Sequence, residues 1–243
     1  MIYLFISDLH LSPEHPRLFR GFLDLLDHYK DQNTQLYILG DWFNAWIGDD
    51  YSAPWLDEII VALKEFTSRK NQIFFSVGNR DFALHQIFLN KFGGQLLQEI
   101  SYLQINDVNI RLEHGDALCT DDISYQRFKK IIRNPIVIWT LRKTPLSFRV
   151  KLANGFRDKS KSAKGFKSYE VMDVNQAAVQ NALGNADLLI HGHTHRPSIH
   201  QVNHKIRVVL GDWRLDHAQI LLVDQNQLFK NQLSSLQLEN WTY

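Results

Sequence analysis

Cysteine is almost absent from this 243-residue sequence, in which Cys119 is the only one. A single cysteine excludes an internal disulfide bond and any cluster of thiolates that would bind a metal ion. It also fits a reducing compartment such as the cytoplasm, where structural disulfides are rare. Cys119 itself is expected to be a small buried apolar residue.

Long hydrophobic runs are absent as well. No apolar stretch approaches the roughly 20 residues that a membrane-spanning helix needs. The apolar stretch from Met1 to Ser7 is short and is interrupted at once by Asp8 and His10, which is unlike a signal peptide. We therefore expect a cytoplasmic protein that does not cross a membrane.

A surplus of charge of one sign is also missing. The 27 Lys and Arg nearly balance the 26 Asp and Glu, and the resulting net charge of +1 favours no class of partner. The hydrophobic fraction of 44% is ordinary for a globular protein, and the length allows a sizeable core. Because no repeat, low-complexity tract or linker divides the sequence, we expect one domain over residues 1–243.

The hydrophobic pattern predicts strands that alternate with helices in the first half. Apolar runs at 2–6, 36–39 and 73–77 predict buried strands, and stripes at 16–30 and 54–69, each opened by a proline, predict helices. The second half predicts a hairpin at 102–112, a strand before His191, a hairpin at 199–210 and strands through Leu222 and Leu228. This mixture favours a layered α/β (α+β) fold, with two mixed β-sheets flanked by helices.

Asp, Asn and His residues follow the ends of these predicted strands. Each lies two to five positions beyond a strand, and the set is Asp8, His10, Asp41, Asn79, His114, His193 and His195. In α/β proteins, ligands bind at the carboxyl edge of the sheet, where the loops after the strands converge. Five separate segments are therefore expected to deliver these side chains to one place.

A metal centre is the first hypothesis for this set, because imidazole is the commonest metal-binding side chain. Seven ligands are too many for one tetrahedral ion and suit two ions that share a carboxylate. Oxygen and imidazole ligands without thiolate favour Mn, Fe or Zn, and two such ions can clamp a phosphoryl group. A polar loop at 191–197 whose histidines bind nothing is the alternative.

Five short motifs resemble the signature of the calcineurin-like metallophosphoesterases. In chain order they are Asp8-Leu9-His10, Gly40-Asp41, Gly78-Asn79, His114-Gly115-Asp116 and Gly192-His193-Thr194-His195. The resemblance implies the two-sheet sandwich of that family and two divalent metal ions, with Mn²⁺ as the expected metal and Asp41 as the bridging ligand. It divides the remaining ligands into Asp8, His10 and His195 on one ion and Asn79, His114 and His193 on the other. His191 is then expected to be a bystander.

A narrower resemblance covers nearly the whole chain. The stretches 40–50, 78–82, 118–122 and 172–176 are similar to those of the UDP-2,3-diacylglucosamine hydrolases, a family of lipid A biosynthesis in Gram-negative bacteria. The resemblance implies hydrolysis of the substrate pyrophosphate to UMP and 2,3-diacylglucosamine 1-phosphate, by attack of a metal-bridging hydroxide on the uridine-side phosphorus. A phosphodiesterase or nuclease of the same superfamily is the alternative, and a non-catalytic binding scaffold is a remote one.

Arg80 stands after Asn79, where many phosphatases of the superfamily have a histidine that can act as an acid. An arginine instead offers a fixed fork of donors to diphosphate oxygens and cannot donate a proton. The catalytic set that the resemblance implies is Asp41, Asn79, Arg80, His114, His193 and His195. Asp81 and Asp116 are expected to orient the ligands, and the chain departs from the family at Asn44 and Asp212.

Residues 121–169, here called the lid segment, combine cations with apolar side chains. Between 127 and 167 the sequence has thirteen Lys and Arg and one acidic residue, Asp158, and Pro135 and Pro145 are expected to divide it into short helices. A helical lid over the predicted metal site would suit acyl chains, phosphates and an anionic membrane surface. A solvated basic face is the alternative. Nucleic acid is disfavoured, because aliphatic side chains do not stack on bases.

The narrower resemblance also implies residues that contact the substrate, namely Asn79, Arg80, Asp122, Ser160, Lys164, Lys167 and His193. Helix capping is the alternative role for Asp122 and Ser160. The expected partners are a nucleotide-linked glycolipid and the inner-membrane surface, to which the protein would bind peripherally from the cytoplasmic side. No nucleic acid and no obligate protein partner are expected.

Overall fold

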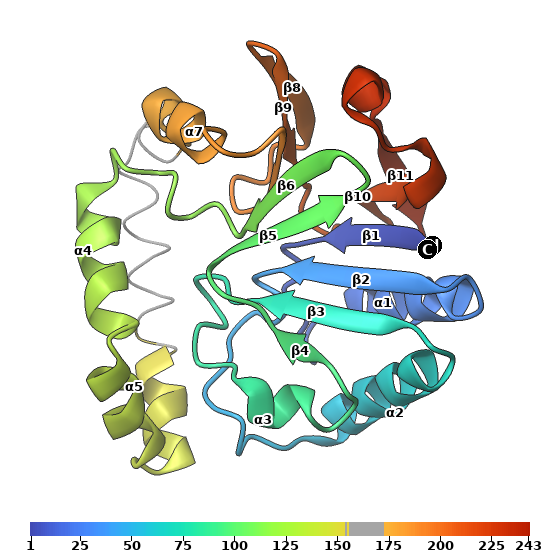
Figure 1. Cartoon of the computed structure of the whole chain (residues 1–243). Coiled ribbons are helices and arrows are strands. Elements are labelled where there is room, and N and C mark those ends of the chain that lie inside the picture. The colour runs from blue at the N-terminus through green and yellow to red at the C-terminus, as the bar shows by residue number, and fades with distance from the viewer. Residues whose placement is uncertain (154, 156–172) are drawn as a thin grey trace.

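Two mixed β-sheets pack against each other in the computed structural model, which describes residues 1–153, 155 and 173–243 (Figure 1). The first sheet has the spatial order β11 (Leu238–Thr242), β10 (His217–Asp224), β1 (Ile2–Ile6), β2 (Thr34–Leu39), β3 (Gln72–Ser76) and β4 (Gln95–Leu96). The second has the order β5 (Ile100–Ile105), β6 (Val108–Glu113), β7 (Leu188–His191), β9 (Lys205–Val209) and β8 (Ser198–Val202). The predicted sandwich of two mixed sheets is confirmed.

The core lies in layers because successive side chains of a strand face opposite sides of a sheet. In β1, Tyr3 and Phe5 are buried between the two sheets, whereas Leu4 and Ile6 face the helices. Three helices cover that outer face, α1 (Pro16–Tyr29), α2 (Pro54–Ser68) and α3 (Gln86–Leu89). α7 (Gln176–Ala182) packs on the outer face of the second sheet.

Parallel strands at the centre of both sheets set up a common edge. β1, β2 and β3 are parallel neighbours in the first sheet, and β6, β7 and β9 are parallel neighbours in the second. The loops after these strands therefore leave from carboxyl ends that lie side by side within each sheet. This edge is called the metal edge below.

The predicted strand through Leu228 is wrong. β10 ends at Asp224 and is followed by the 3₁₀ turn η1 (Gln225–Gln227), after which Leu228 packs into the core between the sheets. The outermost strand of the first sheet is β11, which follows η2 (Lys230–Ser235) and pairs with β10. β11 is an edge strand with few inward side chains, so its hydrophobic pattern is weak.

The described part of the lid segment is helical, as predicted. It contains α4 (Ile123–Ile132), α5 (Pro135–Arg142) and helical residues at 146–153. Each proline stands at or just before the start of a helix, because proline is tolerated in the first turn. In Figure 1, α4 and α5 stand on the side toward which the arrows of β1, β2 and β3 point. Among the described residues, no helix is both long and apolar enough to cross a bilayer.

Candidate metal centre

Most of the predicted ligands have a backbone conformation that is rare for residues with a side chain. φ is positive at five of them, at Asp8 (55°), His10 (52°), Asp41 (52°), His193 (69°) and His195 (55°). Residues in the left-handed region cost about 1–3 kcal/mol each and persist only where their surroundings hold them. The sharp turns after β1, β2 and β7 are therefore maintained by the contacts described below.

Two glycines allow these turns to come close together. A Cβ atom on Gly78 would lie 2.2 Å from Asp41 Oδ1, and one on Gly192 would lie 2.2 Å from Asp8 Oδ2. Any side chain at either position would displace a carboxylate. The glycines in the Gly-Asn and Gly-His motifs are thus needed for the approach of one loop to the next.

Asp8, His10 and His195 form the first ligand group. His195 Nε2 lies 3.2 Å from Asp8 Oδ1 and 3.3 Å from His10 Nε2. Two nitrogen ligands that are each about 2.1 Å from a tetrahedral ion lie roughly 3.4 Å apart. The spacing of the two imidazole groups therefore fits an ion held between them, and one ligand atom from each residue lies within 4.8 Å of the others.

Asn79, His114 and His193 form the second group, with one residue from each of the loops after β3, β6 and β7. Asn79 Oδ1 lies 3.0 Å from His114 Nε2 and 2.9 Å from His193 Nδ1, and these two nitrogens are 3.2 Å apart. His114 Nδ1 donates a hydrogen bond to the carbonyl oxygen of Leu39 at 2.9 Å. That bond fixes the proton on Nδ1 and leaves the Nε2 lone pair for an ion.

Asp41 lies between the two groups. Its Oδ2 is 3.9 Å from His10 Nδ1 and its Oδ1 is 3.8 Å from His114 Nε2. One carboxylate oxygen thus faces each group, which is the placement that a bridging ligand requires. Asp8 also lies near this point, since ligand atoms of Asp8, Asp41 and His114 fall within 4.8 Å of one another.

The electrostatics of both groups fit divalent cations. Burial, followed by the charge of Arg80, holds the pKa of His10 well below its usual value, so this ring is neutral and able to bind a metal. Burial, followed by the charge of His114, lowers the pKa of His193 to about 3, so the ring is neutral and able to bind a metal. Burial opposes ionisation of Asp8, but His195 and the other neighbouring histidines outweigh it and hold the pKa of Asp8 well below its usual value.

Asp81 holds the backbone of two loops together. Its Oδ1 accepts a hydrogen bond from Gly78 N at 2.7 Å, and its Oδ2 accepts one from Trp42 N at 2.7 Å. Burial, with the negative charge of Asp41 as the next cause, raises the pKa of Asp81 to about 7. Asp81 therefore holds together the main chain after β2 and β3, which carries the predicted ligands Asp41 and Asn79, and these bonds do not contact a predicted ligand side chain.

Asp116 connects the metal edge to α4. It accepts hydrogen bonds from Tyr125 Oη at 2.5 Å, Lys129 Nζ at 3.1 Å and Arg133 Nη2 at 2.9 Å. The Tyr125 ring stacks on His193 with the ring centroids 6.1 Å apart. The sequence did not single out these three residues for the site, although their spacing of four places them on one face of a helix.

Arg80 is fixed beside the bridging carboxylate. Its backbone N–H donates to Asp41 Oδ1 at 2.8 Å, and its Nε lies 3.4 Å from Asp41 Oδ2. Its Nη1 donates to Asn44 Oδ1 at 2.7 Å. Asn44, where the chain departs from the family, is an uncharged acceptor, so it orients the guanidinium without neutralising it.

Neither His191 nor Asp212 belongs to the two ligand groups. The His191 ring bonds elsewhere, because Nδ1 donates to Gly192 O at 2.9 Å and Nε2 accepts from Arg207 Nε at 3.1 Å. Asp212 Oδ2 lies 3.6 Å from His195 Nδ1, a contact that the sequence did not indicate. Asp212 is three positions after β9, so the rule that located the other residues could have found it.

Four residues predicted to contact substrate belong to the lid segment. Asp122 caps α4, since its Oδ1 accepts hydrogen bonds from Tyr125 N at 3.0 Å and Ser124 Oγ at 2.8 Å. A helix cap and a ligand contact are compatible, so substrate binding by Asp122 stays a prediction. Ser160, Lys164 and Lys167 lie outside the described residues.

The two sheets and the paired ligand groups define a class of protein. A family model described as calcineurin-like phosphoesterase matches residues 1–197, which include both ligand groups. The chain belongs to the calcineurin-like phosphoesterase family and is a metal-dependent hydrolase.

Curated relatives narrow the comparison to one group within that family. The chain is 43% identical over 216 residues to the UDP-2,3-diacylglucosamine hydrolase of Pseudomonas entomophila (strain L48), with 86% of this chain and 90% of the relative covered. It is 40% identical over 227 residues to the protein of the same name from Haemophilus influenzae (strain PittGG), with 93% and 96% covered. For the one from Azotobacter vinelandii (strain DJ / ATCC BAA-1303), identity is 42% over 219 residues, and 88% and 91% are covered. The resemblance inferred from the motifs is confirmed.

Proposed function

We propose that this protein hydrolyses the pyrophosphate of UDP-2,3-diacylglucosamine and releases UMP and 2,3-diacylglucosamine 1-phosphate. The names of the relatives support this substrate. The observation in the structure that supports it best is Arg80, whose guanidinium is held by Asn44 and Asp41 beside the two ligand groups. A fixed arginine fork next to two metal sites suits a substrate with two adjacent phosphates.

The proposed metal ions are two Mn²⁺, held by the two ligand groups with Asp41 shared between them. Bound metal ions of this kind activate water at neutral pH and withdraw charge from phosphoryl oxygens. Asn79 is an uncharged ligand and adds no repulsion toward the substrate phosphates. Arg80 would bind the diphosphate oxygens and stabilise the charge that develops when the uridine-side phosphorus is attacked. The leaving group is a sugar phosphate, a weak base that needs no proton from the residue at position 80.

The lid segment is the proposed binding region for the lipid. We treat it as an insertion within a single domain of residues 1–243, with Asp122, Ser160, Lys164 and Lys167 as substrate contacts. In α5, Ile136 is 73% exposed and Trp139 is 63% exposed, and the cations Arg142 and Lys143 follow them. An exposed apolar surface beside cations suits an anionic membrane. Peripheral binding to the cytoplasmic face of the inner membrane is therefore part of the proposal.

A comparison of two substrates tests this function against that of a general phosphodiesterase. Purified protein loaded with Mn²⁺ is assayed for UMP release from UDP-2,3-diacylglucosamine and for hydrolysis of bis-p-nitrophenyl phosphate. We expect kcat/KM to be much higher for the glycolipid, because only this substrate engages both Arg80 and the lid segment. A higher value for the generic ester would contradict the proposal.

Metal dependence is tested on the same protein. Removal of metal by a chelator, followed by dialysis, is expected to abolish UMP release, and added Mn²⁺ is expected to restore it. Zn²⁺ and Mg²⁺ serve as comparisons for metal preference. Full turnover in metal-free buffer would overturn the assignment of both ligand groups.

A further inference from the structure

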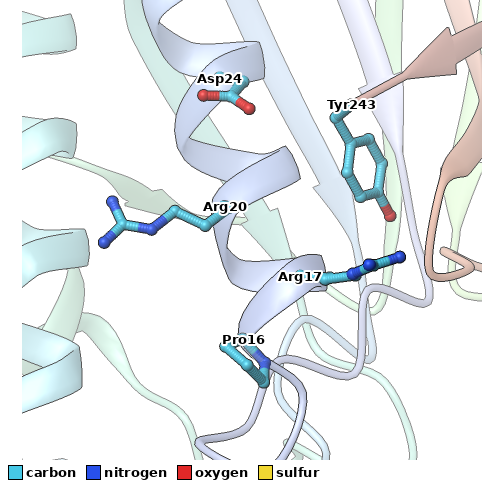
Figure 2. A pocket seen from close by; sticks show the side chains of 5 residues that line it. All are labelled: Pro16, Arg17, Arg20, Asp24 and Tyr243. Atoms are coloured by element: carbon cyan, nitrogen blue, oxygen red, sulfur yellow. The ribbon is translucent and has the colours of Figure 1, made fainter.

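Two cavities away from the metal ligands contain arginines, but the arginines differ in burial. The smaller has a volume of about 310 Å³ and lies between α1 and Tyr243 (Figure 2). Its arginines, Arg17 and Arg20, are exposed to solvent. Water therefore solvates both guanidinium groups, and they require no ligand.

The larger cavity, here called the Arg207 pocket, has a volume of about 580 Å³ and is lined by Asp173, Gln176, Arg196, His200 and Arg207, among others. Arg207 is only 7% exposed. Its Nε donates a hydrogen bond to His191 Nε2 at 3.1 Å. Among the residues that the structure describes, Arg207 makes no ion pair, so its two terminal amino groups have no acidic partner. A buried charge without a partner is costly, and burial lowers the pKa of Arg207 accordingly.

The Arg207 pocket lies close to the metal edge. β7 and β9 are parallel neighbours, with Leu189 opposite Arg207 and His191 opposite Val209. Arg207 is therefore two residues from the carboxyl end of β9, at the edge where His193 and His195 follow β7. Another residue of the pocket, Arg196, directly follows the predicted ligand His195 in the sequence.

The pocket lies on the outer face of the second sheet. Ile206 and Val208, the neighbours of Arg207 in β9, are buried between the two sheets. Arg207 therefore faces the other side, where Leu189 packs with residues of α7. In Figure 1, α7 and the β8–β9 hairpin lie at one end of the metal edge, and α5 lies at the opposite end.

The polar groups of the pocket are both donors and acceptors. His200 lies opposite Arg207 in the β8–β9 pair, so the two side chains share a face. Arg196 pairs with Asp173, and Gln176 adds an amide with both donor and acceptor atoms. A uracil base presents two carbonyl oxygens on either side of an N–H, which requires this kind of mixed set. The volume also lies within the usual range for small-molecule sites.

We infer that the Arg207 pocket binds the nucleoside of a uridine nucleotide whose phosphate lies at the metal edge. This inference rests on the proposed function, in which the scissile phosphorus has a nucleoside on one side and a lipid on the other. The α5 end of the lid segment would receive the lipid, and the pocket at the other end of the edge would receive the base. Arg207 would donate from its two terminal amino groups to a carbonyl oxygen of uracil.

The test measures binding of UMP to the Mn²⁺-loaded protein by calorimetry. Arg207→Met removes the donors and keeps much of the volume, and we expect it to weaken UMP binding at least tenfold. Arg17→Met, in the smaller cavity, is the matched control and is expected to leave UMP affinity unchanged. Inorganic phosphate is the second probe, and its affinity is expected to be the same in Arg207→Met as in the wild type.

Arg207 also supports His191, so its replacement could disturb the fold. Circular dichroism and metal content identify that case. Gln176→Ala and His200→Ala are then the informative variants, because both residues line the pocket without the bond to His191. Each is expected to weaken UMP binding several-fold and to raise KM for UDP-2,3-diacylglucosamine more than it lowers kcat.

Several outcomes would overturn the inference. UMP affinity that is insensitive to all three variants excludes the pocket as the nucleoside site. An equal loss of phosphate affinity shows a simple anion site, and AMP binding as tight as UMP binding shows that the base is not recognised. If the wild type hydrolyses UDP-2,3-diacylglucosamine, these results contradict only nucleoside binding in the Arg207 pocket, and the proposed function stands. If pocket variants weaken UMP binding but the glycolipid is not hydrolysed, the proposed function fails instead.

Discussion

The metal edge and the lid segment differ in the kind of side chain that each buries or exposes. At the metal edge, Asp8, Asp41 and His114 are almost completely buried, with Asp41 only 2% exposed. In α5 of the lid segment, none of the residues, all of which the structure describes, is buried. One region has polar groups where water is excluded, and the other has apolar groups where water is present.

The difference indicates which contacts each region lacks. A buried cluster of carboxylates and imidazoles is stable when cations neutralise it, whereas exposed Ile136 and Trp139 are stabilised when apolar surface covers them. The first region is held rigidly by hydrogen bonds to main-chain atoms, as Asp81 shows. In the second, α5 makes no buried contact along its whole length.

In the part of the lid segment that the structure describes, two sets of contacts reach the body of the protein near the metal edge. In and just after α4, Tyr125, Lys129 and Arg133 bind Asp116. After α5, Arg149 Nη1 donates to Ile47 O at 2.6 Å and to Asp50 Oδ1 at 2.7 Å. The loop that contains Ile47 and Asp50 also contacts Arg80, because Trp46 N donates to Arg80 O at 3.0 Å. The lid segment is therefore connected to the proposed phosphate-binding residue.

The largest effect is expected from removal of the shared carboxylate. Replacement of a residue that only supports a metal ligand typically costs 10- to 100-fold, so Asp41→Ala should lower kcat/KM by on the order of 1,000-fold or more. Metal content should fall, while circular dichroism should change little. Asp24→Ala, on the exposed face of α1, is the control. Activity within tenfold of the wild type would contradict the bridging role.

A smaller effect is expected from Arg80→Lys. Lysine keeps the positive charge but loses the planar fork, and we expect kcat/KM for UDP-2,3-diacylglucosamine to fall by roughly 10- to 100-fold. Asn44→Ala, which removes only the acceptor that orients Arg80, should lower it by a few fold. Metal content measured in both variants should match the wild type. Equal losses in the two variants would show that orientation accounts for the whole effect of Arg80.

The connection between the two regions is tested by a double-mutant cycle on Arg149 and Asp50. Arg149→Met is expected to raise KM for the glycolipid by about three- to tenfold, since a hydrogen bond to an exposed partner such as Asp50 contributes roughly 0.5–1.5 kcal/mol. Asp50→Asn should have a smaller effect, and the double variant should resemble Arg149→Met. Arg20→Met, in the exposed pair with Glu58, is the control. If the two changes have strictly additive effects on KM, Arg149 does not act through its contact with Asp50.

The smallest effect on turnover is expected from the exposed surface of α5. Trp139→Ser should weaken sedimentation with vesicles that contain anionic lipids by several-fold, because a large apolar side chain no longer enters the interface. Activity on detergent-dispersed substrate should change less than vesicle binding. Val61→Ser provides a matched control, since Val61 is also exposed, at 65%, but lies on α2. If Trp139→Ser and Val61→Ser weaken vesicle binding equally, α5 is not the surface that contacts the membrane.

Much of the site could be predicted because its signals are local. Each predicted ligand follows a buried apolar run, and the parallel arrangement of β1, β2 and β3 brings the ends of such runs together. The contacts that were missed depend on long-range packing. Asp212 approaches His195 only because β9 lies beside β7, and Tyr125 reaches His193 only because α4 lies against the metal edge.

By itself, the sequence determined the central strands of both sheets, the two long helices α1 and α2, the residue types at the metal edge and the cationic, apolar character of the lid segment. These properties depend on the period of the hydrophobic pattern and on the chemistry of individual side chains. Only the tertiary structure decided how Asp41 lies between the two ligand groups, and that Arg207 is buried without an acidic partner among the described residues. The burial of a side chain and its distance from side chains of other segments depend on which segments pack together. The hydrophobic pattern within one segment does not contain that information.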